Sequence, residues 1–277
     1  MDFAESEDIV MGGPWREEIL GDGQVRLICG DCREVMPTIP RADITVTSPP
    51  YNTLPKTAKA SGMHAERNSG VNLWIEKAAN GYADQKPEQE YQEWLNDILL
   101  ACANMTNGLI WVNHKVRYRD GEAIHPTRII HLPIYAEVIW NRGGSMALNC
   151  KRFAPSHEGI WAFGSPHYWD DCNNTLMSVW AIPHAQRDGD NEHPCPYPES
   201  IVRPLIESSC PPDGIILDPF MGSGTTGVAA VKLGRRFIGI EIEPKYFDIA
   251  CRRISEALKQ PDMFVEQPVP PKQEAML

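Results

Sequence analysis

Residues 214–227, GIILDPFMGSGTTG, decide the fold of this 277-residue chain. They read as an apolar strand, then a glycine turn, then a helix that continues through residues 228–231 and stops at Gly234. Glycines accept positive φ and let the backbone approach a ligand closely, while the start of a helix offers unpaired N–H groups to an anion. The stretch therefore predicts the first half of a nucleotide-binding βαβ unit.

The next strand is expected at residues 236–242, and it carries a carboxylate, Glu241, near its end. A carboxylate in this place accepts hydrogen bonds from both hydroxyls of a ribose. The spacing Gly222-x-Gly224-x-x-Gly227 also satisfies the dinucleotide fingerprint, so an NAD-dependent oxidoreductase is one alternative. Neither Gly-Lys-Ser nor Gly-Lys-Thr follows the glycines, which disfavours a P-loop for ATP.

A second informative stretch is TSPPYN, residues 47–52, which follows an apolar strand predicted at residues 42–46. Two consecutive prolines fix two φ angles and remove two N–H donors, so the carbonyls and the Ser48 hydroxyl remain as rigid acceptors. Tyr51 adds a flat aromatic face. Fixed acceptors beside a stacking ring suit a planar ligand with an amino group, such as an extruded nucleobase. A proline-rich turn that only closes the strand is the structural alternative.

Taken together, the two stretches resemble the DNA amino-methyltransferases, in which the glycine segment binds S-adenosylmethionine and a segment such as Ser-Pro-Pro-Tyr holds the target amine. Here the catalytic segment precedes the cofactor segment by about 170 residues, an order that resembles the class called beta. The resemblance covers most of residues 25–258. It implies an α/β, Rossmann-like methyltransferase fold in circularly permuted order, with a mostly parallel seven-stranded sheet and helices on both faces.

The resemblance also implies the residues of the site. The catalytic set is Ser48, Pro49, Pro50, Tyr51 and Asn52. Ser48 Oγ and the Pro49 carbonyl would hold the amine hydrogens, and Tyr51 would stack on the base. The cofactor set is Asp31, Asp218, Phe220, Gly222, Ser223, Gly224, Thr225, Thr226, Glu241, Ile242 and His193. In this set Asp31 would contact the cofactor adenine, and His193 would help to enclose the methionine end.

The activity implied is direct methyl transfer from S-adenosylmethionine to the exocyclic amine of a flipped base in double-stranded DNA, with S-adenosylhomocysteine as product. Serine in the first motif position resembles the N4-cytosine members, whereas aspartate is typical of the N6-adenine members. A hydroxyl can also donate to the ring nitrogen of cytosine, which a carboxylate cannot. N4-cytosine is the prediction, and N6-adenine is the close alternative.

Two other classes of protein remain as alternatives. Protein-glutamine and RNA methyltransferases use similar amide chemistry, but their Asn-Pro-Pro-Tyr segment usually follows the cofactor motif, opposite to the order here. A non-catalytic DNA-binding protein descended from an enzyme would not need the intact motif set.

The eight cysteines do not form a convincing metal or disulfide pattern. Cys29 and Cys32 make one C-x-x-C pair, but no second close pair or histidine cluster accompanies it. Cys195 follows Pro194, as in the dipeptide of the carbon-5 cytosine methyltransferases, yet it lies just before the cofactor segment rather than at the strand end. We therefore expect reduced cysteines, a structural Cys195 and no metal.

A formal net charge of −11 is unusual for an enzyme that binds DNA phosphates. Basic residues outnumber acidic ones in residues 113–152, however, which predicts a local positive patch there. The predicted DNA contacts are Lys56, Lys59, Lys115, Arg117, Arg119, Arg142, Lys151 and Arg152.

The chain is expected to form one catalytic domain, since its length and 42% hydrophobic content can supply one substantial core. Its predicted parts are an N-terminal extension (1–24), a catalytic half (25–163) with a long mobile loop at about 53–89, a target-recognition insertion (164–192), a cofactor-binding half (193–260) and a disordered tail (261–277). The interior Pro204 conflicts with the helix expected around residues 201–206.

No apolar run is long enough to cross a membrane, and the first residues are acidic rather than signal-like. We expect a cytoplasmic protein without membrane association. A homodimer and a cognate restriction endonuclease are the further partners that the resemblance implies.

Overall fold

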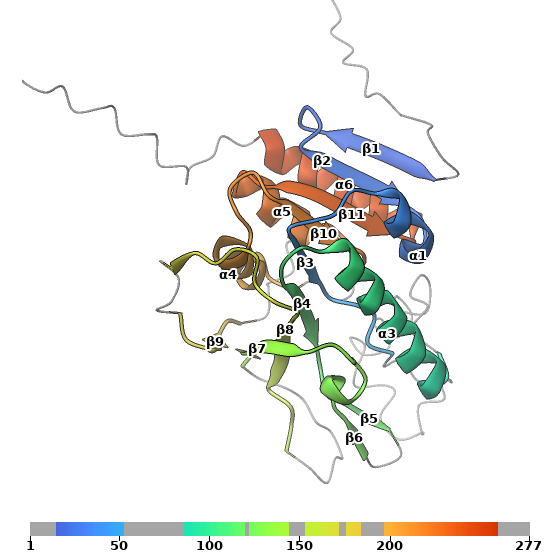
Figure 1. Cartoon of the computed structure of the whole chain (residues 1–277), viewed down its shortest axis with the longest axis vertical. Coiled ribbons are helices and arrows are strands. Elements are labelled where there is room, and N and C mark those ends of the chain that lie inside the picture. The colour runs from blue at the N-terminus through green and yellow to red at the C-terminus, as the bar shows by residue number, and fades with distance from the viewer. Residues whose placement is uncertain are drawn as a thin grey trace, which may run out of the picture.

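The structure is a computed structural model, and it describes residues 15–52, 86–119, 122–143, 153–171, 176–183 and 197–259. Figure 1 shows a twisted central sheet with helices on both of its sides. The predictions at Lys56, Lys59, Lys151, Arg152, His193 and Cys195, at most of the 53–89 loop and at the 261–277 tail lie outside these residues.

Nine strands form the main sheet, in the order β1-β2-β11-β10-β3-β4-β8-β7-β9. The strands are β1 (Arg16–Leu20), β2 (Val25–Cys29), β3 (Ile44–Thr47), β4 (Ile110–His114), β7 (Ile134–Asn141), β8 (His157–Phe163), β9 (Val179–Ala181), β10 (Ile215–Asp218) and β11 (Arg236–Glu241). The five neighbours from β2 to β4 are parallel. A separate antiparallel pair, β5 (Arg117–Arg119) and β6 (Glu122–Ile124), lies outside this sheet.

The helices cover both faces of the sheet. One hydrophobic cluster lies between the sheet and the helices of one face, α4 (Glu199–Ser209), α5 (Thr225–Lys232) and α6 (Pro244–Lys259). A second cluster lies between the sheet and the helices of the other face, α1 (Cys32–Val35) and α3 (Glu88–Met105). Short 3-10 helices, η1 (Met36–Thr38) and η2 (Pro126–Arg128), follow α1 and β6. Apolar side chains alternate between the clusters along β4, β8 and β10: in β10, Ile216 faces the first and Leu217 the second.

This architecture confirms the predicted α/β fold with a mostly parallel sheet. The strands β2, β11, β10, β3, β4, β8 and β7 correspond to the seven that the resemblance implies, and β1 and β9 extend the two edges. Strand β1 corrects the predicted domain boundaries, which assigned residues 16–20 to an N-terminal extension. Its residues pair antiparallel with β2 across a tight turn that contains Gly21 and Gly23, both at positive φ.

β9 comes from the segment predicted as a target-recognition insertion. It pairs in parallel with β7, and Trp180 packs against the core, as does Trp169 in the same segment. The strand before β9 in the sheet, β7, forms an antiparallel pair with β8, and β8 lies between β4 and β7. The sequence could not place β9 because a three-residue strand has no measurable periodicity.

Helix α4 passes directly through Pro204, which settles the conflict noted in the sequence. The helix begins at Glu199, so Pro204 lies at its sixth residue and removes one N–H from the ladder. The hydroxyls of Ser208 and Ser209 donate to the carbonyls of Pro204 and Leu205, at 2.7 and 2.6 Å. Such back-bonding is compatible with a locally distorted helix.

The permuted order of the chain places its two key loops side by side. β3, which precedes Ser48, pairs in parallel with β10, which precedes the glycine loop. From β10 the chain runs to β11 on one side, and from β3 it runs to β4 on the other. Because the direction of winding reverses here, the carboxyl ends of β10 and β3 form the crevice where open α/β sheets bind ligands.

Candidate active site

One buried carboxylate joins the two loops. Asp218, at the end of β10, accepts a hydrogen bond from the Thr47 hydroxyl at 2.8 Å, although the two residues are 171 positions apart. It also accepts from Thr226 Oγ1 at 2.7 Å and from the Phe220 N–H at 3.1 Å. Burial raises the pKa of Asp218 to about 6. With both oxygens engaged, Asp218 fixes the loops relative to each other.

Three residues of the predicted cofactor set have hydroxyls that bond to other side chains of the protein. Thr226 bonds to Asp218 and to the Tyr197 hydroxyl, and it is fully buried. Ser223 and Thr225 both bond to Arg253 of α6. These three side chains therefore shape the loop, and a ligand in the crevice would meet backbone N–H groups at the start of α5. The sequence could not show this, because their partners come from distant elements.

The glycine loop has the backbone that the sequence predicts. Gly222 and Gly224 have φ of 53° and 81°, a region that non-glycine residues rarely adopt. The Gly222 N–H donates to Glu241 Oε2 at 2.9 Å, and the Glu243 N–H donates to Oε1 at 2.9 Å. Each oxygen of Glu241 keeps a lone pair that can accept a ribose hydroxyl. Ile242, two-thirds exposed, lies next to it as an apolar surface.

Asp31 lies at the end of β2, on the same side as Glu241. Its carboxylate caps α1 through the Arg33 N–H and forms a two-pronged ion pair with the Arg33 side chain, with a shortest distance of 2.6 Å. The hydrogen bonds from Arg33 lower the pKa of Asp31, so the group is ionised. An adenine amine would share this carboxylate with Arg33.

An aromatic pair completes the cofactor side of the crevice. Phe220 lies 5.5 Å from the ring of Trp94, measured between centroids. Trp94 and Arg33 line an open cavity of about 300 Å³. The place of Trp94 beside the glycine loop comes from the structure.

The predicted catalytic residues form a hydrogen-bonded chain. The Asn113 amide donates to the Gly159 carbonyl at 3.2 Å, which leaves Asn113 Oδ1 to accept from the Tyr51 hydroxyl at 2.8 Å. Glu158 offers a second acceptor to Tyr51 at 3.3 Å. Because Tyr51 has one hydroxyl proton, Ser48 Oγ must be the donor across its 2.9 Å contact with Tyr51. The lone pairs of Ser48 then remain available to an amine.

The prolines and Asn52 are fixed by neighbouring elements. Tyr91 of α3 donates to the Pro50 carbonyl at 2.7 Å and lies 2.8 Å from Nε2 of His114. Burial lowers the pKa of His114 to about 3, and its ring lies 4.7 Å from that of Tyr51. Asn52 is fully buried at φ 53°, and its amide makes two hydrogen bonds of 2.9 Å with the backbone of Lys86.

Sequence reasoning missed Asn113, His114, Glu158 and Tyr91 as parts of this site. Asn113 and His114 end β4, the strand beside β3, and both are buried. Polar residues that directly follow an apolar strand were the available signal, since carboxyl ends of parallel strands meet at one edge. Glu158 and Tyr91 gave no such signal, because they lie on an antiparallel strand and a helix.

Four of the basic residues predicted as DNA contacts are described, and three of them, all arginines, bond to neighbouring groups of the protein. Arg117 is buried, and its guanidinium forms two hydrogen bonds of 2.6 and 2.7 Å with Glu88. Arg119 donates to the Asn52 carbonyl, and Arg142 donates to Glu158 at 2.9 Å. Because its guanidinium is enclosed and paired, we propose that Arg117 supports the site and does not contact a phosphate. Lys115 lies with its Nζ 5.1 Å from the centroid of the Tyr51 ring.

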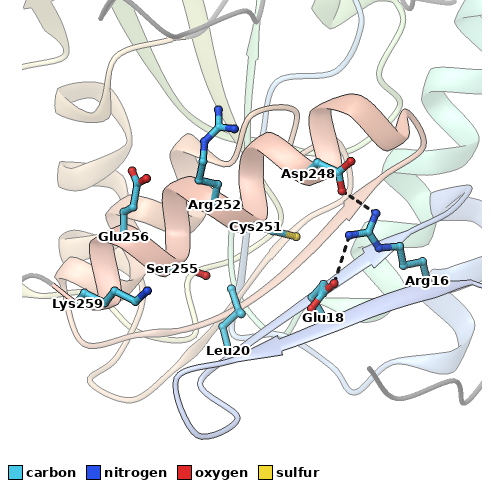
Figure 2. Close-up of a pocket in the computed structure, with 9 residues that line it drawn as sticks. All are labelled: Arg16, Glu18, Leu20, Asp248, Cys251, Arg252, Ser255, Glu256 and Lys259. Atoms are coloured by element: carbon cyan, nitrogen blue, oxygen red, sulfur yellow. Dashed lines mark hydrogen bonds and ion pairs between the residues drawn. The ribbon is translucent and has the colours of Figure 1, made fainter. Parts of the chain in front are cut away.

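A larger cavity, of about 350 Å³, lies away from this crevice. It separates β1 from α6 at the edge of the sheet, and Figure 2 shows its mixed acidic and basic lining. Arg16 bridges Glu18 and Asp248 at 3.3 and 2.6 Å across one end. Within the described part of the chain, no group of three or more His, Cys, Asp or Glu side chains is arranged to hold a metal ion.

The fold and the crevice define an α/β enzyme that brings a nucleoside-binding loop next to a rigid amine-binding loop, which is the arrangement of methyltransferases. Comparison with known proteins agrees. The family model N6_N4_Mtase, described as DNA methylase, matches residues 42–252. The chain therefore belongs to the N6/N4 DNA methylase family, and it is a DNA methyltransferase of that family. This membership sets aside the NAD-dependent oxidoreductase.

Individual relatives support the same assignment. The type II methyltransferase M.ScaI of Streptomyces caespitosus is 30% identical over 288 residues, which cover 88% of this chain and 84% of that protein. Among solved structures, the PvuII DNA methyltransferase, titled cytosine-N4-specific, superposes with a TM-score of 0.63 at 17% identity, covering 83% and 86% of the two chains. M1.HpyAVI, solved as a SAM complex, superposes with a TM-score of 0.55 at 22% identity, covering 83% and 99%.

Proposed function

We propose that this enzyme transfers a methyl group from S-adenosylmethionine to N4 of a cytosine that is extruded from double-stranded DNA. The observation that carries the proposal is the junction of the Ser48–Tyr51 loop with the glycine loop through Thr47 and Asp218. This junction brings an acceptor for an amine next to a site for a nucleoside. The extrusion of the base is part of the proposal, since a paired cytosine cannot present its amine to a crevice.

The described residues fit S-adenosylmethionine. Glu241 would accept the ribose hydroxyls, the ionised Asp31 would accept from the adenine amine, and Phe220 and Ile242 would contact the ring. The first-turn N–H groups of α5, which have no partners within the helix, would face the carboxylate of the methionine end. His193, outside the described residues, stays a predicted contact at that end. When bound, the cofactor supplies a methyl group on a sulfonium, ready for direct displacement.

The protein's part in the reaction is to prepare the amine. The lone pair of an exocyclic amine is delocalised into the ring, so the nitrogen is planar and a poor nucleophile. Ser48 Oγ and the Pro49 carbonyl would accept its two hydrogens and favour a tetrahedral nitrogen as the N–CH₃ bond forms. After the displacement the methylated nitrogen carries a positive charge, and it would lose one proton to water. Tyr51 would stack on the base.

Two observations support cytosine. The first position of the motif is a serine rather than an aspartate, and the N4-cytosine-specific PvuII enzyme has the TM-score of 0.63 reported above. In the hydrogen-bonded chain of Ser48, Tyr51 and Asn113, the Ser48 proton is directed to Tyr51, so Ser48 Oγ acts toward the base as an acceptor. Donation to the ring nitrogen of cytosine would require the Ser48 proton to turn from Tyr51 toward the base.

Mass spectrometry of nucleosides from host DNA tests the proposal directly. Expression of the chain should produce N4-methylcytosine, and long-read sequencing of the same DNA should place it in one recognition sequence. DNA from cells that express Ser48→Ala is the matched control and should lack the mark. N6-methyladenine in place of N4-methylcytosine would overturn the choice of base, and the absence of both marks would overturn the activity.

Cofactor affinity should depend on pH through Glu241. Burial raises the pKa of this carboxyl to about 7, and only the ionised form accepts hydrogen bonds from two ribose hydroxyls with both oxygens. As the pH falls from 8 to 6 the group takes up a proton, so the Kd for S-adenosylhomocysteine should rise about tenfold. Calorimetric titration measures this change.

The control is Glu241→Gln, which should bind more weakly at pH 8 and show little pH dependence between pH 6.5 and 8. Asp218, whose pKa is about 6, titrates mostly below this range. A pH profile that is the same in the variant and the wild type would show that Glu241 is not the group responsible.

The partners follow from the same assignment. M.ScaI is named a type II methyltransferase, so we propose that this enzyme protects DNA against a cognate endonuclease. We also propose a cytoplasmic location, where its DNA substrate would be, and a homodimer. None of the described helices has the length and apolarity required to cross a bilayer.

A further inference from the structure

Helix α6 packs against the glycine loop. A Cβ added to Gly224 would lie 3.0 Å from Ala250 Cβ and 3.1 Å from Ile254 Cδ1, both in α6. At Gly227 it would lie 2.4 Å from Ile254 Cδ1 and 2.7 Å from Phe237 Cε1. Two of the three fingerprint glycines are thus required by the close approach of α6, whatever the ligand on the other side.

One side chain of α6 reaches into the loop itself. Arg253 Nη1 donates to the Ser223 carbonyl, to Ser223 Oγ at 3.0 Å and to Thr225 Oγ1 at 3.4 Å. Ser223 and Thr225 are buried, with 3% and 6% of their surfaces exposed. A cation therefore holds three oxygens of the loop away from solvent. Hydrogen bonds from a charged donor are stronger than neutral ones, which makes Arg253 the main polar connection between α6 and the loop.

The place of these bonds in the loop gives them a consequence for ligands. A carbonyl held from behind fixes the plane of the Ser223–Gly224 peptide, and Gly224 immediately precedes the first turn of α5. The free N–H groups of that turn are the ones offered to a ligand in the crevice. If the loop also populated other conformations, the apparent affinity for the ligand would fall in proportion to the fraction in the binding conformation. Holding the loop in that conformation avoids this loss.

We propose that Arg253 is a positioning residue that holds the glycine loop in its cofactor-binding conformation, without touching the cofactor. This inference rests on the proposed use of S-adenosylmethionine. It adds a residue of the C-terminal helix to the cofactor site, and it separates cofactor binding from the chemistry at Ser48. The loss of Arg253 should therefore change the affinity for the cofactor and leave the acceptors of the amine intact.

The experiment compares Arg253→Ala with Arg252→Ala. Arg252 is the adjacent residue, is exposed and lines the cavity between β1 and α6 that Figure 2 shows. Calorimetry with S-adenosylhomocysteine should give a Kd about 10- to 100-fold higher for Arg253→Ala, as expected for the loss of a charge-assisted hydrogen bond. Arg252→Ala should keep the wild-type value.

Steady-state kinetics supply the readout that a general loss of structure would not give. For Arg253→Ala the KM for S-adenosylmethionine should rise with the Kd, whereas kcat at saturating cofactor and the affinity for duplex DNA should stay within about threefold of wild type. Arg253→Lys keeps the charge but replaces the planar fork by a single ammonium, so it should fall between the two.

The outcomes separate this inference from the proposed function. If Arg253→Ala is folded and binds the cofactor as tightly as wild type, or loses kcat without a change in KM, the inference is wrong. If Arg253→Ala does not fold, Arg253→Lys decides by the same criteria. Failure of the wild-type protein to bind S-adenosylhomocysteine would instead contradict the proposed function.

Discussion

Replacement of Ser48 with alanine is expected to reduce methyl transfer to DNA by about 10²- to 10³-fold and to leave the Kd for S-adenosylhomocysteine unchanged. The hydroxyl is one of two acceptors proposed to hold the amine, and its loss removes an interaction that strengthens as the nitrogen becomes tetrahedral. The Ser48 hydroxyl bonds to Tyr51, within the catalytic loop, so the cofactor loop should not respond. A radiolabelled methyl-transfer assay and calorimetry measure the two quantities.

Two variants provide controls for Ser48→Ala. Tyr51→Phe keeps the stacking ring but removes the oxygen that accepts the Ser48 proton, and we expect a smaller loss, of about tenfold. Ser255→Ala removes a hydroxyl from the cavity between β1 and α6, and turnover should not change. Wild-type turnover in Ser48→Ala would refute the assignment of Ser48 as an acceptor.

Replacement of Arg117 with alanine is expected to lower the free energy of unfolding by about 3 to 5 kcal/mol. The side chain of Arg117 is 1% exposed, and it pairs with Glu88 at the first residue of α3 while lying 4.5 Å from the centroid of the Tyr91 ring. Its removal would leave Glu88 without its closest cation and would loosen Tyr91, which holds the Pro50 carbonyl. Urea denaturation would detect the change as a lower midpoint.

The same variant tests the proposed role of Arg117. Each phosphate contact adds about 0.9 to the slope of log affinity against log salt, so loss of a true DNA contact would lower that slope. We expect the slope of Arg117→Ala to equal that of wild type. Arg128→Ala, the replacement of an exposed arginine after β6, should keep wild-type stability. A stable Arg117→Ala with a reduced slope would restore the original DNA-contact assignment.

Much of the fold could be predicted because its signals are local. The strand expected at residues 236–242 is β11, Arg236–Glu241, and the strand expected at residues 42–46 overlaps β3, Ile44–Thr47. Apolar periodicity and turn glycines depend only on neighbouring residues. β1 was missed because its residues, REEIL, have little apolar periodicity of their own, and β9 was missed because it is a three-residue strand whose partner, β7, lies far away in the sequence.

The site was predicted as two loops, and its internal connections were not. The sequence identified Ser48 to Asn52 and Gly222 to Thr226 as the important segments. It placed Ser223, Thr225 and Thr226 in the cofactor set but did not show that their hydroxyls bond to Arg253 and Asp218. A motif identifies the type of side chain at a position, but the direction of that side chain depends on what packs behind it.

By itself, the sequence determined that this chain forms a parallel α/β sheet with a glycine loop and a rigid Ser-Pro-Pro-Tyr loop, because strand periodicity, proline geometry and glycine turns are encoded in adjacent residues. Only the tertiary structure decided that the Ser48 hydroxyl meets the Tyr51 hydroxyl, that Arg117 is buried and that Arg253 donates to the glycine loop. Hydrogen bonds and ion pairs act over a few ångströms in space. Their partners are therefore set by the order of strands in the sheet, which brings Thr47 and Asp218 into contact across 171 residues.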